Sequence, residues 1–516
     1  MSKVTGARVA RGAFWLSVGS GLGTVISAFA TIIIARLLGP ENYGAYSAAF
    51  LLVTLLSISD IGLNVAATHY ISESRAKGKY FLGYIKAALM GAIVTGSIIA
   101  LTIIVFSDLI ATLVFQKGYL EPLIILAAFM ILGTAITNVV RGILLGTDKM
   151  SLIAFLTISS SIIRNFFAIT LIILGLGAFG AMAGQMIGNI SIAILGCLIV
   201  IFQIIRFSDH DDSIVNHLSE LFSYGLPYAG GVFASLIFSQ FYNVLAARTL
   251  DDFTYGNFAA AWMAYTGSTI LIGAISSALF PNLTELFAAD KKAVSRVFSY
   301  AVKYTSLVVL PIATIFMGIS ETLIGFFYGE KYALAASFLR LLSLSLLLSI
   351  LGLGVSLSAL LSLKRTKTIA WIRLVAILVS LFFVLLMYGA LTAYTLIIAF
   401  VIMNTMSTIV SFLVLRRDYG VSLDAKFSIK ALLAAFIALV SIWYLEQILN
   451  DTVITFLICV PLGILIYAFL ISVLGALSIK DYENMKRYAA GTPLINRIIL
   501  LVISYMEAIH RKFHKN

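Results

Sequence analysis

Residues 35–49 read ARLLGPENYGAYSAA, and residues 247–261 read ARTLDDFTYGNFAAA. The two stretches align without a gap at a constant offset of 212 residues. The identical pairs are Ala35/Ala247, Arg36/Arg248, Leu38/Leu250, Tyr43/Tyr255, Gly44/Gly256, Ala48/Ala260 and Ala49/Ala261. Apolar sequences share short matches through composition alone, but charged, aromatic and glycine identities at one offset favour an internal duplication.

The composition of the whole chain indicates a membrane protein. Of its 516 residues, 61% are apolar and only 11% are charged, against roughly 25% charged in an average soluble domain. The mean hydropathy is +1.05. A soluble enzyme or a DNA-binding factor cannot bury so much apolar surface, and disorder requires low hydrophobicity and high charge. The chain is therefore predicted to be an all-α polytopic membrane protein.

Stretches long enough to cross a bilayer recur along the whole sequence. A crossing helix needs ~20 mostly apolar residues. We predict fourteen of them, at residues 12–36, 45–70, 83–106, 122–145, 151–174, 179–205, 223–247, 257–280, 304–327, 336–361, 369–388, 392–415, 430–449 and 452–475.

The duplication then divides these spans into two equivalent sets. The first repeated stretch joins spans one and two, and the second joins spans seven and eight. Each half therefore holds six spans in the same orientation, with a pseudo-two-fold axis along the membrane normal, an arrangement that suits alternating access. The predicted domains are a six-helix bundle at 1–206, a second at 207–418, two extra helices at 419–477, and a cytoplasmic tail at 478–516 with an amphipathic interfacial helix.

The distribution of basic residues predicts the orientation. The net charge is +12, and with the N-terminus inside only Arg36, Lys117, Arg248 and Lys331 fall on the outer side. Because Lys and Arg collect in cytoplasmic loops, both termini are predicted to be cytoplasmic, in a multi-pass protein of the cell membrane. The loops are too short for a soluble catalytic domain, so no enzyme activity is expected.

The first hairpin resembles a known family. The run ARLLGPENYG at 35–44, the run Asp60-Ile61-Gly62-Leu63 and the run His69-Tyr70-Ile71 are similar to the start of the polysaccharide-transporter flippases. These belong to the multidrug/oligosaccharidyl-lipid/polysaccharide exporter superfamily. The resemblance implies translocation of polyprenyl- or dolichyl-linked oligosaccharide to the outer leaflet, through a cleft with a cationic lining between two bundles. The extra pair of helices resembles that of the lipid II flippase branch, where it forms a groove for the lipid tail.

Arg164 is the clearest candidate for contact with such a substrate. It lies 12 residues after Leu152, ~18 Å along a helix and close to the midplane. Thr157, Ser161 and Arg164 share one helical face. A charge at this depth usually faces the interior of a bundle, and a guanidinium binds phosphate oxygens bidentately. The alternative is a structural Arg paired with a neighbouring span.

Asp60 is the only carboxylate well inside a predicted span, and it shares a polar stripe with Asn64. It is a candidate proton or sodium site or a contact for sugar hydroxyls. An ion pair with Arg36 or Arg164 that fixes helix packing is an equal alternative. Either way, its position predicts that it faces the protein interior.

Further cations and amides are weaker candidates. Arg36 and Arg248 lie at equivalent span ends, where they either reach the outer interface or line the outer mouth of the cleft. Arg340 in span ten has the same two interpretations. The amides are candidates either for binding sugar hydroxyls or for joining helices. They are Gln185, Asn189, Gln240, Asn243 and Asn404.

No cofactor or metal site is predicted, and no nucleic-acid partner. The expected partners are lipid-linked oligosaccharide and membrane lipids, with H⁺ or Na⁺ as a candidate coupling ion, and the sequence leaves the oligomeric state open. A cation-coupled multidrug exporter of the same superfamily is the main alternative function. It is less favoured because such exporters usually have twelve spans and need acids for cationic substrates. A membrane glycan polymerase or ligase is less favoured still, because it commonly carries a long outer loop.

Overall fold

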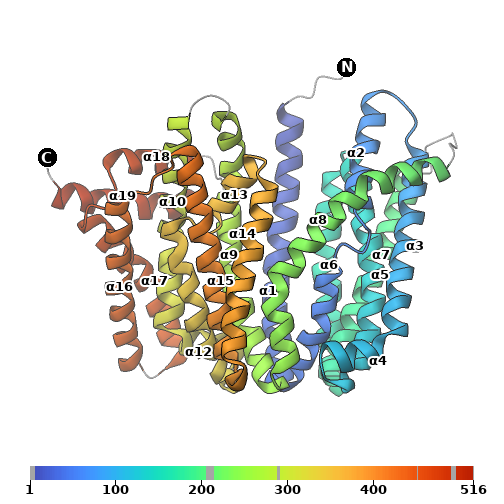
Figure 1. The fold of residues 1–516 in the computed structure, drawn as a ribbon, viewed down its shortest axis with the longest axis horizontal. Coiled ribbons are helices and arrows are strands. Elements are labelled where there is room, and N and C mark those ends of the chain that lie inside the picture. Colours follow the sequence, from blue (N-terminus) through green and yellow to red (C-terminus); the bar gives the residue numbers. More distant parts are fainter. Residues whose placement is uncertain (1–5, 205–213, 288–290, 450, 490–495, 515–516) are drawn as a thin grey trace. The chain divides into compact units, whose positions relative to one another are not determined.

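The computed structural model describes residues 6–204, 214–287, 291–449, 451–489 and 496–514, and these ranges are helical without any strand (Figure 1). The chain divides into two compact units, Met1–Gly256 and Asn257–Asn516. The predicted all-α architecture is confirmed. The long helices carry many exposed apolar side chains, which is typical of helices whose outer face meets lipid.

The first unit is built from long helices that pack side by side. Helices α5, α6 and α7 contact one another, α1 packs on α6, and α3 packs on α5. The helices are α1 (Gly6–Leu55), α2 (Leu63–Ala76), α3 (Leu82–Val105), α4 (Ser107–Leu109), α5 (Glu121–Gly146), α6 (Met150–Leu171), α7 (Gly177–Gln203) and α8 (Ile214–Thr249).

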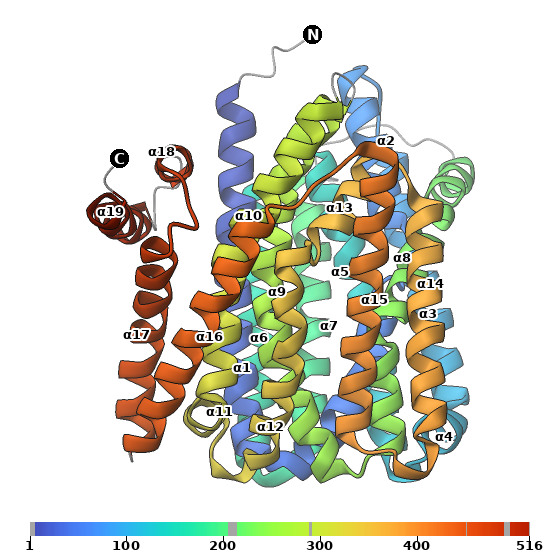
Figure 2. The ribbon, with the colours of Figure 1, turned by 60° about the vertical axis from the view of Figure 1, so that its left-hand side comes forward.

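The second unit continues the pattern and ends in two short helices, α18 and α19, that follow α17 (Figure 2). A 3-10 helix at Ser343–Leu351 separates α12 from α13. The helices are α9 (Asp252–Phe287), α10 (Lys291–Gly318), α11 (Ser320–Tyr328), α12 (Ala333–Leu342), α13 (Val355–Ser362), α14 (Thr366–Leu386), α15 (Ala393–Tyr419), α16 (Ala425–Ile448), α17 (Thr452–Val473), α18 (Ile479–Ala489) and α19 (Asn496–Phe513).

Eleven helical segments in the described ranges are long and apolar enough to cross a membrane. Arg11–Leu55 contains the first predicted span and the first part of the second, and Met150–Gln203 contains the fifth and nearly all of the sixth. Helix α9 covers the predicted span 257–280 without being among the eleven. The protein is a multi-pass membrane protein, and the count of fourteen crossings stays a prediction.

The second predicted span, 45–70, is not one continuous helix. Helix α1 ends at Leu55 and α2 begins at Leu63. Between them Ile61 has a φ of 49° and Gly62 a φ of 76°, which a regular helix does not contain. Gly62 also lies directly against α8: a Cβ at this position would be 2.3 Å from the carbonyl oxygen of Gly225. The break is therefore fixed by backbone conformation and by a close contact with α8.

The two repeated stretches contact each other. A Cβ on Gly44 would lie 2.1 Å from the carbonyl oxygen of Asp252, and one on Gly256 would lie 1.8 Å from that of Pro40. Only glycine fits either position. Gly39, with a φ of 71°, bends the chain just before the first contact. The matched glycines thus allow two backbones to meet, which explains why both copies of the repeat carry one.

Helix α8 packs on α2 and α3 within the first unit. The repeat predicts instead that span seven begins the second half of the molecule. The predicted domain boundary between 206 and 207 lies outside the described residues. The two six-helix bundles that the repeat predicts therefore stay a prediction, whereas packing divides the chain after Gly256. In the tail, α19 packs against α17 through Ile503 and Met506. Its placement at a membrane interface stays a prediction as well.

Candidate functional site

Arg164 is a half-buried cation without a carboxylate partner. It lies on α6, and its Nε donates a hydrogen bond to the carbonyl oxygen of Ser160 at 3.2 Å. Gly188 of α7 packs directly on its backbone, since a Cβ there would lie 2.4 Å from the Arg164 Cα. Tyr46 lies within electrostatic range. Among the described residues, no Asp or Glu forms an ion pair with Arg164.

A second guanidinium lies within electrostatic range of the first. Arg141 of α5 is half-buried, and its Nε is enclosed without a hydrogen-bond partner in the described part of the chain. No carboxylate of the described ranges pairs with Arg141 either. Placing an unpaired charge at the centre of a bilayer costs ~2.5–3.5 kcal/mol on insertion scales. An anion would stabilise two such cations, so Arg141 and Arg164 are a candidate anion site.

The hydropathy pattern does not single out Arg141, although another signal for it exists in the sequence. Thr134, Asn138 and Arg141 follow the spacing i, i+4, i+7 on α5, the same spacing that singled out Arg164. Arg141 lies near the predicted cytoplasmic end of a span, where a basic residue needs no further explanation. In the structure two members of this stripe bind other segments: Thr134 accepts a hydrogen bond from Asn189 of α7, and Asn138 donates one to Asp60 in the break between α1 and α2.

Asp60 is fully buried and is held by amides. Its Oδ2 accepts a hydrogen bond from the backbone N–H of Asn64 at 2.9 Å, and its Oδ1 accepts one from Asn138 Nδ2 at 3.2 Å. The predicted alternative of an ion pair with Arg36 or Arg164 is wrong. The carboxylate instead satisfies a free N–H in the first turn of α2, where a negative charge is favoured.

Asn64 is engaged locally. Its Oδ1 accepts a hydrogen bond from the N–H of Val65 at 2.6 Å, and its backbone carbonyl packs against Gly142 of α5. Asn64 and Asp60 therefore both stabilise the start of α2 beside the break in the second span. A role for either residue in ion or sugar binding stays a prediction.

Two of the candidate amides join helices. Gln185 Nε2 of α7 donates to Asn165 Oδ1 of α6 at 3.1 Å, and both side chains are buried. Asn189 Nδ2 donates to Thr134 Oγ1 of α5 at 3.1 Å. Interhelical hydrogen bonds of this kind contribute ~0.6 kcal/mol each in membranes. These contacts favour the packing interpretation for both residues.

The other amides bind within their own helix or next to the repeat. Asn243 Nδ2 donates to Gln240 Oε1 at 3.1 Å. The hydroxyl of Tyr255, the tyrosine of the second repeat, donates to Asn243 Oδ1 at 3.0 Å. Asn404 Nδ2 of α15 donates to the carbonyl oxygen of Phe400 at 3.1 Å. Whether any of the three contacts a sugar stays a prediction.

The arginines at the span ends differ from one another. Arg36 is exposed and forms no hydrogen bond or ion pair in the described part of the chain. Arg248 Nη1 donates to the carbonyl oxygens of Leu113 at 2.6 Å and Val114 at 3.3 Å. In the second unit, Arg340 Nη2 lies 3.3 Å from Glu321 Oε1 in an exposed ion pair. Equivalent positions in the repeat thus have different partners.

Arg141 lies within electrostatic range of Arg164, and the other candidates lie at separate places. In the described ranges, no group of His, Cys, Asp or Glu side chains could hold a metal ion. A guanidinium pair of this kind can attract and orient a phosphate or diphosphate, since each guanidinium offers two parallel donors. The fold and this site define a multi-pass membrane protein with a cationic site in its first helical unit.

Comparison with known proteins gives the family. Residues 9–287, more than half of the chain, match the family described as "Polysaccharide biosynthesis protein", and the chain belongs to this family. It is 24% identical over 343 residues to the succinoglycan biosynthesis transport protein ExoT of Rhizobium meliloti (strain 1021), over 65% of this chain. The match spans just under two thirds, 66%, of that relative's length. The resemblance predicted from the first hairpin is therefore confirmed.

Solved structures share the fold. The lipid II flippase MurJ in an inward closed conformation matches with a TM-score of 0.70 and 17% identity, over 89% of this chain and 98% of that chain. An inward-facing multidrug resistance MATE family transporter of the MOP superfamily matches with a TM-score of 0.64 and 18% identity, over 78% of this chain and 98% of that chain. At these identities the matches establish a common architecture.

Proposed function

We propose that the protein is a flippase that translocates lipid-linked oligosaccharide across the cell membrane for polysaccharide or glycoconjugate biosynthesis. The family and the name of the succinoglycan transport relative support this function. The fold shared with a lipid II flippase agrees with it. The observation that carries the proposal is the pair Arg141 and Arg164, two guanidinium groups without a carboxylate in the described part of the chain.

In this mechanism the chain's own residues supply charge and shape, and no covalent step occurs. Arg164 and Arg141 attract the phosphate or diphosphate that joins the carrier lipid to the glycan. The lipid tail stays in the bilayer while the glycan crosses by alternating access. Both termini face the cytoplasm of a cell whose plasma membrane holds the protein, and H⁺ or Na⁺ is the candidate coupling ion.

A double substitution tests the proposal. Arg141→Gln with Arg164→Gln should lower the rate of lipid-linked oligosaccharide translocation in proteoliposomes by about 100-fold or more, because hydrogen bonds to charged groups contribute ~1.5–3 kcal/mol each. Arg164→Lys should retain only part of the rate, since Lys keeps the charge but loses the planar fork. Arg11→Gln, which removes an exposed cation of α1, is the matched control and should keep the wild-type rate.

Protein abundance in the membrane must be measured in parallel. If the double variant is lost from the membrane, the two arginines are structural and the proposed site is wrong. If abundance and glycan translocation are both unchanged while export of cationic drugs falls, the multidrug-exporter alternative replaces the flippase.

A further inference from the structure

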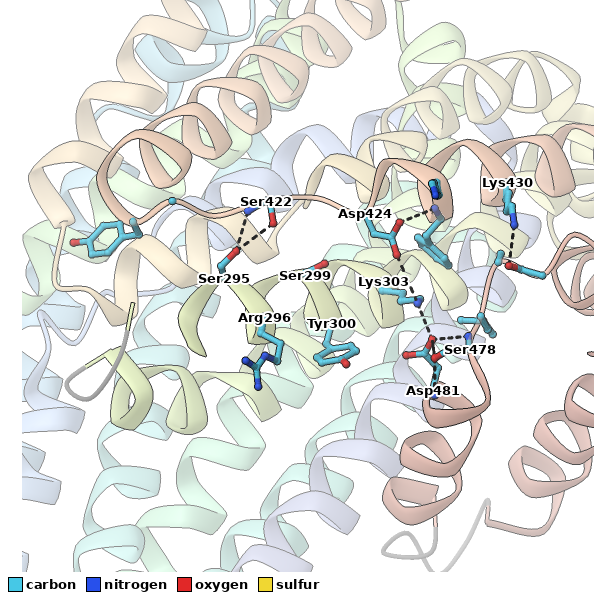
Figure 3. Close-up of a pocket in the computed structure, with 17 residues that line it drawn as sticks. Ser295, Arg296, Ser299, Tyr300, Lys303, Ser422, Asp424, Lys430, Ser478 and Asp481 are labelled. Atoms are coloured by element: carbon cyan, nitrogen blue, oxygen red, sulfur yellow. Dashed lines mark hydrogen bonds and ion pairs between the residues drawn. The ribbon is translucent and has the colours of Figure 1, made fainter. Parts of the chain in front are cut away.

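A cavity of about 810 Å³ lies in the second unit, distant in sequence from the arginine pair. Three segments form it: the first half of α10, the stretch from the end of α15 to the start of α16, and the turn between α17 and α18 (Figure 3). Its charged lining residues are Arg296, Lys303, Lys426, Lys430, Asp424 and Asp481. We call this cavity the α10–α16–α18 pocket.

One cation of the pocket is neutralised inside the protein. Lys303 Nζ lies 2.7 Å from Asp481 Oδ2 and 3.9 Å from Asp424 Oδ2. Lys303 and Asp481 are 8% and 2% exposed. Asp424 also accepts a hydrogen bond from the N–H of Phe427, and Asp481 accepts one from that of Ser478. Both carboxylates of the pocket are therefore occupied by internal donors.

Three cations remain for a ligand. Arg296 and Lys426 are exposed, and neither forms an ion pair or hydrogen bond within the ranges that the structure describes. Lys430 Nζ donates only to the carbonyl oxygen of Gly475, at 3.0 Å. In Figure 3, Lys303 points toward Asp424 and Asp481, whereas Arg296 points away from them. The pocket thus presents positive charge that its own acids do not neutralise.

Neutral donors complete the lining. The hydroxyl of Ser299 lies in the pocket, together with those of Ser295 and Ser422, which bond to each other at 3.3 Å, and that of Ser478, which donates to Asp481. A phosphate group offers several acceptor oxygens, and it is bound by charge-assisted hydrogen bonds from Arg and Lys together with hydroxyl donors. An arginine, two lysines and serine hydroxyls fit a phosphate better than they fit a cationic ligand or a neutral sugar.

The pocket adjoins a lipid-facing surface. On α16, Lys426, Ile429, Leu433 and Phe436 follow one helical face, and the three apolar side chains are 68%, 46% and 64% exposed. One face of α16 therefore begins with a basic side chain and continues with exposed apolar side chains. The same order, a charged group followed by hydrocarbon, occurs in an anionic lipid. The lysines and arginines of this region also lie on the side that the charge distribution predicts to be cytoplasmic.

We propose that the α10–α16–α18 pocket binds the phosphate headgroup of an anionic lipid from the cytoplasmic leaflet. Basic pockets between membrane helices on the cytoplasmic side are known to hold such headgroups. The lipid is either a membrane phospholipid or the diphosphate-bearing carrier lipid, which share the same recognition chemistry. The proposal does not rest on the flippase function, because it concerns binding alone.

The test measures lipid binding to the purified full-length chain through the rise of its unfolding temperature with lipid concentration. Phosphatidylglycerol should bind, and phosphatidylcholine with the same acyl chains should bind at least 10-fold more weakly. Each basic side chain at a membrane surface contributes about 5-fold in affinity for anionic lipid, so Arg296→Gln with Lys426→Gln should weaken phosphatidylglycerol binding about 30-fold. Lys364→Gln with Lys367→Gln removes two exposed cations of the same unit outside the pocket and should leave the affinity unchanged.

A second arm separates the two sources of the headgroup. It uses polyprenyl diphosphate in the Arg141→Gln/Arg164→Gln background, so that the arginines of the first unit contribute nothing. Binding at least 10-fold tighter than that of phosphatidylglycerol identifies the carrier lipid, and equal or weaker binding identifies a membrane phospholipid. The proposal is overturned if both pairs of substitutions weaken phosphatidylglycerol binding equally, or if phosphatidylcholine binds as well as phosphatidylglycerol.

Discussion

One site in each unit places cations in the protein interior, and the two sites treat the charge in opposite ways. In the second unit, Lys303 is almost fully buried and lies 2.7 Å from Asp481, so its charge is neutralised within the fold. In the first unit, Arg141 and Arg164 are half-buried and within electrostatic range of each other, and no carboxylate of the described chain pairs with either. The Lys303–Asp481 pair is complete within the fold. Arg141 and Arg164 leave positive charge that a bound anion would neutralise.

This difference separates structural cations from cations available to a ligand. Removing one partner of a buried ion pair leaves an uncompensated charge, so stability should fall. Removing a cation that has no partner leaves nothing unpaired, so stability should hold while ligand binding falls. Stability and binding measured on the same variants therefore distinguish the two classes.

The largest loss of stability is expected from Lys303→Ala. It leaves the Asp481 carboxylate buried without its cation, which costs about 3–5 kcal/mol in comparable pairs. The measurement is the unfolding temperature of the purified full-length chain. As a control, Lys303→Met combined with Asp481→Asn removes both charges, keeps an acceptor for Ser478, and should recover most of the loss. An unchanged unfolding temperature for Lys303→Ala would remove the distinction between the two units.

Acid should produce a smaller loss at the same pair. Burial alone would raise the pKa of Asp481, but hydrogen bonds from Lys303 and from Ser478 hold it below its ordinary value. A carboxyl with a lowered pKa stabilises the fold above its unfolded-state pKa of about 3.9, and this contribution disappears as the pH falls through the lower folded-state pKa. Unfolding temperatures between pH 6 and pH 3 should therefore show a component that Asp481→Asn lacks. Identical pH profiles would exclude this role for Asp481.

The smallest effect is expected at the matched arginines of the repeat. Arg248 binds two carbonyl oxygens, so Arg248→Gln should lower the free energy of unfolding by about 1 kcal/mol. Arg36 is exposed and unbonded among the described residues, so Arg36→Gln should change it by less than about 0.5 kcal/mol. Chemical or thermal unfolding of both variants gives the comparison. Equal losses would mean that Arg36 has a structural partner in the membrane.

Much of the fold could be predicted from the sequence, because hydropathy reports directly on burial in lipid. The paired Gly44 and Gly256 also marked the two equivalent hairpins, and the structure gives the reason, a backbone contact that excludes any side chain. The break in the second span could not be found in this way. Hydropathy averages over about 20 residues, whereas the break depends on the φ angle of Gly62 and on its contact with Gly225, far away in sequence.

The site was predicted in part. Arg164 was identifiable because a charge in the middle of an apolar stretch is costly and needs an explanation. Arg141 lies five residues before the end of α5, where the excess of cytoplasmic basic residues already accounts for it. The partners of Gln185 and Asn189 depend on which helices pack together, which one sequence does not determine.

Arg141 and Arg164 lack acid partners in the described part of the chain, and we expect a phosphate-bearing lipid to supply the counter-charge. The most direct measurement compares the affinity for polyprenyl diphosphate with that for uncharged polyprenol. It uses the Arg296→Gln/Lys426→Gln variant, so that the α10–α16–α18 pocket does not contribute to binding. We expect the arginine pair to favour the diphosphate by about 100-fold or more, and Arg141→Gln with Arg164→Gln to abolish this preference without lowering the unfolding temperature of the ligand-free chain. An undiminished preference in that variant, or a loss of stability like that expected for Lys303→Ala, would contradict the account.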